Sequence, residues 1–172
     1  MDEITLAIAQ LTFLSLKEKL VLRKNIDSLD KLALLSIEDI SSIVLRAVKP
    51  DFWNGQEIAR LARQAALIMQ KTGIKGVLFE EEQYPALLRE TFLPPYALFY
   101  RGNIDVLKKQ CISVVGTRKI TREGAEAAIS FAKDASADGR TVISGLAFGT
   151  DTFAHKGAVE YALEKNVPVD KD

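Results

Sequence analysis

The sequences CISVVGTRK at residues 111–119 and TVISGLAFGTD at residues 141–151 decide the fold of this chain. Each segment begins with a short, apolar, β-branched run and continues into a loop that contains glycine. Such runs are typical of strands that are buried in a parallel sheet. We therefore predict two strands, at residues 111–115 and 141–144, each followed by a loop.

A helical pattern follows each of these loops. Gly139 provides a stop for the first helix, expected over residues 122–138, and Thr150 is expected to cap the second. The order strand, loop, helix, strand, loop, helix predicts parallel strands joined by right-handed crossovers. The residues expected on the buried helix faces are Ala125, Ala128, Ile129, Ala132 and Ala135 in the first helix, and Ala154, Gly157, Ala158, Tyr161 and Ala162 in the second.

Both loops are predicted to open on one crevice, because the loops that follow parallel strands lie at the same edge of the sheet. Their small residues would let backbone N–H groups approach a ligand, and each loop precedes a helix N-terminus with its partial positive charge. Arg118 and Lys119 add two cationic side chains to the first loop. This combination predicts a site for a phosphate group or a phosphate chain.

Three segments resemble one known protein family. GTRKITREG at residues 116–124 resembles its G-S-R-x-x-[ST]-x-x-G loop, and VISGLAFGTDTFAHKGA at residues 142–158 resembles its V-S-G-L-A-x-G-I-D-x-x-A-H-x-G-A segment. YPALLRETFLPPYALFYRGN at residues 84–103 is similar to the family's lead-in. Three matches in the right order point to the DNA-processing protein A (DprA/Smf) family, strongly over residues 84–158 and loosely over the N-terminal third.

The resemblance implies a non-catalytic protein that binds single-stranded DNA and loads a RecA-type recombinase during natural transformation. Complete family members form homodimers, and the sequence gives little support for a dimer of this chain. The expected DNA- or phosphate-binding residues are Gly116, Thr117, Arg118, Lys119, Ser144, Gly145, Phe148, Gly149, Asp151 and Lys156.

The alternative function is that of a small-nucleotide-binding or nucleotide-hydrolysing Rossmann-like domain. Related phosphoribohydrolases carry a P-G-G-x-G-T-x-x-E loop, which is absent here, and the glycine loop is neither G-x-x-x-x-G-K-[ST] nor G-x-G-x-x-G. His155 is the only histidine and has no nearby nucleophile pattern, and no spacing typical of metal ligands occurs. We therefore expect no catalytic residue, metal ion or cofactor.

Five site residues have two interpretations each. Arg118 is interpreted as a phosphate contact in preference to an ordinary surface arginine. Phe148 could stack on a base or fold back against the sheet edge. Asp151 could orient a ligand group, or it could simply favour the first helical turn. Lys119 and Lys156 could each contact phosphate or point to solvent.

Residues 1–75 are expected to form a separate helical domain, which the resemblance implies is of the sterile-alpha-motif (SAM-like) type. Helices are predicted over residues 4–14, 15–25, 28–35, 36–49 and 51–72, and capping boxes begin the second and fourth. Trp53 is expected to anchor the core rather than to stack on a base. Residues 1–54 contain no glycine, so a DNA-gripping helical hairpin is not expected.

Residues 76–172 are expected to form the Rossmann-like domain. Lead-in strands at 77–79 and 97–100 would add to its sheet, and a third parallel strand would fall at Val167-Pro168-Val169. The proline fits a central strand poorly, and the sequence stops shortly afterwards, so we expect a truncated product. The fold class is α/β, with a helical domain followed by a partial Rossmann-like parallel sheet.

The composition places further limits on function. The 23 basic and 23 acidic residues give a net charge of zero, so any DNA contact must come from a local patch. A single cysteine, Cys111, excludes an intramolecular disulfide, and no apolar run is long enough to span a membrane, so a cytoplasmic protein is expected. The basic residues near the crevice loops are Lys108, Lys109, Arg118, Lys119 and Arg122.

Overall fold

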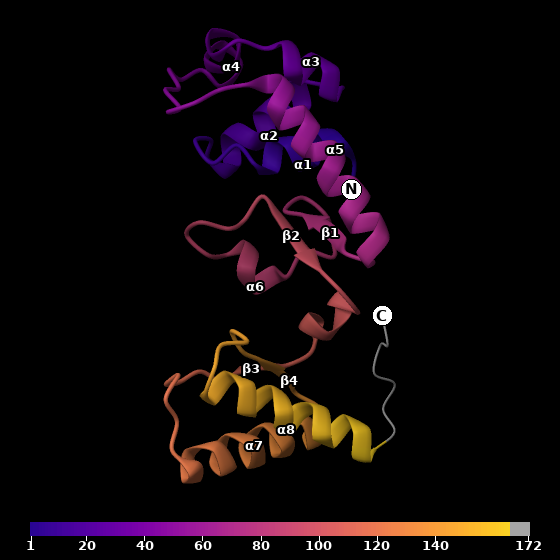
Figure 1. Cartoon of the computed structure of the whole chain (residues 1–172), viewed down its shortest axis with the longest axis vertical. Helices are drawn as coiled ribbons and strands as arrows, with labels where there is room; N and C mark the ends of the chain where they lie inside the picture. The colour runs from indigo at the N-terminus through magenta and orange to yellow at the C-terminus, as the bar shows by residue number, and fades with distance from the viewer. Residues whose placement is uncertain (166–172) are drawn as a thin grey trace. The chain divides into compact units, whose positions relative to one another are not determined.

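The structure is a computed structural model that describes residues 1–165 and forms two compact units (Figure 1). Residues 1–101 make the first unit, and the second begins at Gly102. The first unit contains six helices and an antiparallel strand pair, whereas the second contains a parallel strand pair and two long helices. Mixed helix and strand content with a helical N-terminus agrees with the α/β class expected from the sequence.

Five capped helices begin the first unit, as the sequence predicts. In each of them the side chain of the N-cap residue accepts a hydrogen bond from a backbone N–H of the first turn, which satisfies a donor that the helix leaves open. Ser15 with Glu18 and Ser36 with Asp39 form the two predicted capping boxes. The helices are α1 (Glu3–Ala9), α2 (Leu16–Asn25), α3 (Leu29–Leu34), α4 (Ile37–Val44) and α5 (Gly55–Thr72).

Three helix boundaries differ from the prediction. Helix α1 ends at Ala9 because the chain continues in tight turns, with Leu11 N–H bonded to Ile8 O and Leu14 N–H bonded to Leu11 O. Helix α4 ends at Val44 because Leu45 adopts a left-handed conformation with φ 55°. Helix α5 begins only at Gly55, after its Asn54 cap. The turns that follow α1 keep Leu11 and Leu14 buried in the core.

Large aliphatic side chains from these helices make one core, in which Leu22 and Ile40 are completely buried. Trp53 packs against this core: its Nε1–H donates to Leu35 O over 2.9 Å, and its ring meets Phe13 edge-on. The interpretation of Trp53 as a core anchor is therefore confirmed. Ile68 is exposed, because the buried side of α5 runs through Gly55, Ala59 and Ala62.

The lead-in strands do not extend the parallel sheet, contrary to the prediction. Strands β1 (Lys75–Leu78) and β2 (Ala97–Tyr100) form their own antiparallel pair, with the short helix α6 (Ala86–Arg89) between them. Leu78, Ala97 and the buried ring of Tyr96 pack against the helical core. Residues 76–101 therefore belong to the first compact unit, which extends beyond the division expected near residue 75.

The second unit contains the predicted strand–helix–strand–helix order. After a 3-10 turn (Ile104–Lys108) come β3 (Cys111–Ser113), α7 (Arg122–Ala137), β4 (Thr141–Ile143) and α8 (Thr150–Glu164). The two strands are parallel, with Cys111 opposite Thr141 and Ser113 opposite Ile143. Helices α7 and α8 pack against each other and against β4, on the same side of the strand pair (Figure 1).

The contact between α7 and α8 depends on small side chains. A Cβ atom added at Gly157 would lie 2.2 Å from the carbonyl oxygen of Ile129 on α7, so only glycine permits this approach. The predicted stripe of α7 is largely confirmed. Its buried members are Ala125, Ala128, Ala132 and Ala135, and the buried residues of α8 are Asp151, Ala154 and Gly157.

The parallel strands are not buried on both faces, which corrects the sequence-based expectation. Ile143 of β4 is 38% exposed, because in the described residues both helices cover one side of the two strands. Val115, predicted to lie in the first strand, follows the end of β3 and is 73% exposed. The third strand expected at 167–169 lies outside the described residues. Among residues 1–165, no helix is both long enough and apolar enough to cross a membrane.

Candidate nucleic-acid interface

The two loops predicted to share a crevice lie in direct contact. Thr150 joins them, since its backbone N–H donates to Thr117 O over 3.1 Å and its hydroxyl lies 3.3 Å from the same oxygen. One residue before the second loop, the Ser144 hydroxyl donates to Val114 O over 2.6 Å. These bonds place residues 116–119 and 145–149 at one edge of the strand pair, as expected for loops that follow parallel strands.

Two of the predicted site glycines serve this loop-to-loop contact. A Cβ atom at Gly116 would lie 2.5 Å from the Thr150 hydroxyl oxygen, and one at Gly149 would lie 2.2 Å from Thr117 O. Gly149 also has φ 85°, a conformation that side chains strongly disfavour. Both positions therefore require glycine so that one loop can approach the other, whatever ligand binds there.

The beginning of α8 differs from the prediction. Gly149, and not Thr150, is the N-cap residue, and it makes no side-chain cap. Thr150 is the first helical residue, and its N–H is already used by the opposite loop. One donor of the helix N-terminus is thus unavailable to a phosphate group.

Asp151, in the first turn of α8, binds the second loop through its side chain. The residue is only 6% exposed. Its Oδ2 atom accepts hydrogen bonds from Gly145 N at 3.0 Å and from Ala147 N at 3.5 Å. A Cβ atom at Gly145 would lie 2.9 Å from this oxygen. The carboxylate thus orders the loop from within, which was not foreseen when Asp151 was considered as a ligand contact.

The same loop exposes two large apolar side chains. Phe148 is 84% exposed and Leu146 is 77% exposed, while the Thr152 hydroxyl holds the loop by donating to Ala147 O over 2.7 Å. The interpretation in which Phe148 folds back on the sheet edge is therefore wrong. Leu146 was missed by the sequence analysis, although an apolar residue between two loop glycines is a recognisable signal.

Leu146 has φ 56°, a left-handed conformation that is rare for a residue with a side chain. Such a conformation costs about 1–3 kcal/mol and persists where the surroundings enforce it. Here the bonds from Asp151 to the amides on either side of Leu146 provide that enforcement.

Arg118 and Lys119 supply positive charge at this edge. Both side chains are exposed, and within the described residues neither makes an ion pair or a side-chain hydrogen bond. The Thr117 hydroxyl braces the loop by accepting from Lys119 N over 3.1 Å. Lys156 lies 3.7 Å from Glu160, and Arg122 bonds Glu126 over 3.0 Å, so these two cations are partly neutralised.

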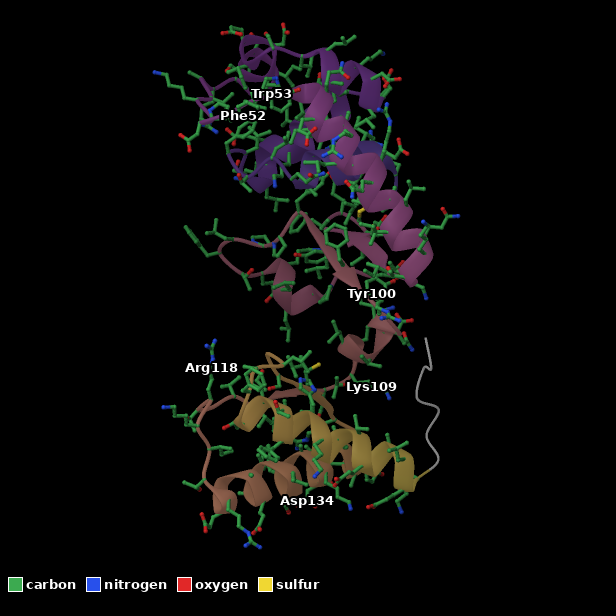
Figure 2. The ribbon with its side chains drawn as sticks, viewed as in Figure 1. Phe52, Trp53, Tyr100, Lys109, Arg118 and Asp134 are labelled. Carbon is green, nitrogen blue, oxygen red and sulfur yellow. The ribbon has the colours of Figure 1, made fainter. Side chains whose placement is uncertain are left out.

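The basic residues that are close in sequence do not form one cluster. Lys108 and Lys109 precede β3, whereas Arg118 and Lys119 follow it, and Figure 2 shows Lys109 and Arg118 at opposite ends of the strand pair. Lys108 also forms an ion pair with Asp105 at 2.8 Å. The available positive charge at the loop edge is therefore smaller than the sequence suggested.

The described residues give no support for a metal site. In the part of the chain that the structure describes, no group of three His, Cys, Asp or Glu side chains could hold a metal ion. The Nε2 atom of His155 is buried without a hydrogen-bond partner in that part of the chain. Cys111 is half-buried, with its Sγ 3.3 Å from Lys109 O. The edge combines cations with apolar side chains, an arrangement that suits binding.

Comparison with known proteins places this geometry in context. The family model of DNA recombination-mediator protein A matches residues 75–168. Protein Smf of Borreliella burgdorferi is 32% identical over 159 residues, which cover 90% of this chain and 48% of that protein. DNA processing protein DprA of Streptococcus pneumoniae is 32% identical over 137 residues, or 80% of this chain and 45% of that protein.

A solved structure is also similar to this chain. The X-ray structure of DNA processing protein A from Streptococcus pneumoniae aligns with 94% of this chain and 55% of that chain, with a TM-score of 0.61 and 26% identity. This chain therefore spans about half the length of the relatives that it matches.

Proposed function

Because this chain belongs to the DNA recombination-mediator protein A family, we propose that it binds single-stranded DNA at the edge formed by residues 116–119 and 145–149. Binding is non-catalytic, and its role is to help place a RecA-type recombinase on the bound strand. The family's description as a recombination mediator supports the recombinase part, and relatives named DNA processing proteins support the DNA part.

The observation that carries the proposal is the combination of free cations with exposed apolar side chains on two loops in contact. Arg118 and Lys119 face solvent on the first loop, and Leu146 and Phe148 face solvent on the second. Proteins that bind single strands without sequence preference combine positive charge along the backbone with side chains on which unpaired bases stack. A duplex would not offer its base faces to this surface.

The arrangement is less suited to a small nucleotide. Phosphate sites at glycine loops use several backbone N–H groups that point toward the ligand. Here Asp151 occupies the amides of Gly145 and Ala147, and Thr117 O occupies the amide of Thr150. The alternative of a nucleotide-binding domain therefore has less support than DNA binding through side chains.

Fluorescence anisotropy with labelled oligo-dT tests the proposal, with AMP, ADP and ATP as unlabelled competitors. Arg118→Ala should weaken binding about two- to fivefold, since an exposed ion pair contributes at most about 1 kcal/mol. The slope of log K against log salt should also fall by about 0.7, the value for one phosphate contact on a single strand.

Lys109→Ala is the matched control, because Lys109 is an exposed cation in the same unit but at the other end of the strands (Figure 2). It should change neither affinity nor slope. Equal effects of the two variants would contradict the proposed interface. Displacement of oligo-dT by a mononucleotide, at a concentration equal to that of the nucleotide units in the oligo-dT, would contradict it as well.

A further inference from the structure

We propose that Asp151 is a positioning residue that determines which class of ligand the loop edge accepts. Its carboxylate fills the anion position of loop 145–149, so the loop presents side chains to bases instead of presenting amides to phosphate. The DNA part of this inference rests on the proposed function.

The geometry around Asp151 is that of an occupied anion site. A single oxygen, Oδ2, receives the N–H groups of Gly145 and Ala147, at 3.0 and 3.5 Å. Leu146, between them, has φ 56°. Successive amides around a left-handed residue form a concave nest that binds anions. In this chain the nest holds a carboxylate that the protein itself supplies.

Phosphate would compete poorly for this position. Its oxygens would have to replace a buried carboxylate of the same charge, and both anions cannot share two amides. The glycine at position 145 fits the internal anion closely, since an added Cβ atom would lie 2.9 Å from Oδ2. The loop that resembles a phosphate cradle in sequence is therefore closed to phosphate.

The same bonds direct the loop's side chains outward. With the amides of Gly145 and Ala147 turned inward to Asp151, the side chains of Leu146 and Phe148 are 77% and 84% exposed. The ring of Phe148, held in this way, suits the face of an unpaired base, since bases stack on aromatic side chains. Asp151 would thus act on DNA through the loop and would not contact the strand itself.

Two substitutions in the full chain separate this role from a general structural one. Asp151→Ala empties the nest, and Asp151→Asn keeps an oxygen acceptor of the same shape without its charge. Asp134→Ala is the matched control, because Asp134 is an exposed carboxylate on α7, away from the loops (Figure 2). Two readouts are followed: anisotropy with oligo-dT, and NMR shifts of the amides of Gly145 and Ala147 during titration with inorganic phosphate.

We expect Asp151→Ala to lose about tenfold in affinity for oligo-dT, the loss that follows if the binding-competent loop is populated about one-tenth of the time. Its amides at Gly145 and Ala147 should respond to phosphate, whereas those of the parent chain should not. Asp151→Asn should retain affinity within about threefold of the parent by the same relation. Asp134→Ala should match the parent in both readouts.

A loss of DNA affinity in Asp151→Ala without any phosphate response would overturn the inference, because a residue with only a structural role gives that result. Unchanged affinity would overturn it as well. If the parent chain does not bind oligo-dT, the proposed function fails, while the phosphate titration still decides whether Asp151 fills the nest. If Asp151→Ala does not fold, Asp151→Asn is decisive: its two amides should exchange hydrogen faster, and unchanged exchange refutes the inference.

Discussion

Replacing Gly157 with alanine should destabilise the second compact unit, although alanine is the better helix former. The new Cβ atom would lie 2.2 Å from the carbonyl oxygen of Ile129 and 2.9 Å from its carbonyl carbon and Cα. All three are backbone atoms of α7, so no side-chain rotation can relieve the clash. The two helices must separate, and the small residues between them lose contact.

The expected size follows from two opposing effects. Replacing glycine by alanine inside a helix contributes about 1 kcal/mol of stability. Overpacking a close contact costs typically about 1–3 kcal/mol and more where backbone must move. Because the obstacle is backbone, we expect a net loss of about 2 kcal/mol, or about 2 M in urea midpoint at a slope near 1 kcal/mol per M. Hydrogen exchange of the α7 and α8 amides during urea unfolding measures this loss.

Gly124→Ala is the matched control in the same helix pair. Its added Cβ atom would meet Ile120 Cγ1 at 3.0 Å, a flexible side chain that can move aside. This variant should equal or exceed the parent in stability, by up to about 1 kcal/mol. If Gly157→Ala is as stable as Gly124→Ala, the close backbone contact between α7 and α8 does not limit stability and the reasoning is refuted.

Three further predictions concern the loop edge and the first unit. Phe148→Ala should leave the unfolding free energy unchanged, because the ring is 84% exposed, but should cost about 1–3 kcal/mol in oligo-dT binding; lost stability without lost affinity would contradict it. The Arg46 guanidinium, with the Ser15 cap, lowers the pKa of Glu18 from 4.5 to about 2. A lowered folded-state pKa stabilises the fold above pH 4.5, and this stabilisation is lost as the pH falls toward 2. About 1–2 kcal/mol of unfolding free energy should therefore disappear on acidification in the parent, and clearly less in Arg46→Met, which keeps only the Ser15 cap; equal losses in both would refute the ion pair's role. A fragment of residues 1–75 should retain helical circular dichroism but unfold at lower urea than residues 1–101, because residues 76–101 complete its core; identical midpoints would show that the strand pair contributes nothing.

The features that local chemistry controls could be predicted from the sequence. Ser15 and Ser36 begin helices because each hydroxyl accepts an N–H of the first turn, an interaction that spans only three residues. The alanines of α7 recur at helical spacing, and that spacing alone identifies the buried side. The parallel order of β3 and β4 follows from the crossover rule, so the meeting of the two loops was also foreseen.

The features that depend on distant pairing could not be predicted. Strand β2 pairs with β1 and not with β3, because Tyr96 finds its place in the helical core of the first unit. Lys109 and Arg118 are only nine positions apart, yet a strand at about 3.3 Å per residue carries them to opposite ends of the sheet. Basic residues that are close in sequence but lie on either side of a strand therefore need not form a charged cluster.

The function of Asp151 lay beyond the sequence for a different reason. A carboxylate in a first helical turn ordinarily has no more than a favourable charge there. Its bonds to amides four and six positions earlier exist only because the intervening loop curls back, with Leu146 left-handed. Nothing in the residue types announces a left-handed leucine, since glycine or asparagine usually takes that conformation.

The placement of Trp53 has a practical consequence for spectroscopy. It is the chain's sole indole, fixed between the carbonyl of Leu35 and the edge of Phe13 within the first compact unit. Its emission therefore reports the melting of residues 1–101, whereas far-ultraviolet ellipticity sums the helices of both units. A difference between the two melting curves would reveal separate transitions, with a single cuvette and no added label.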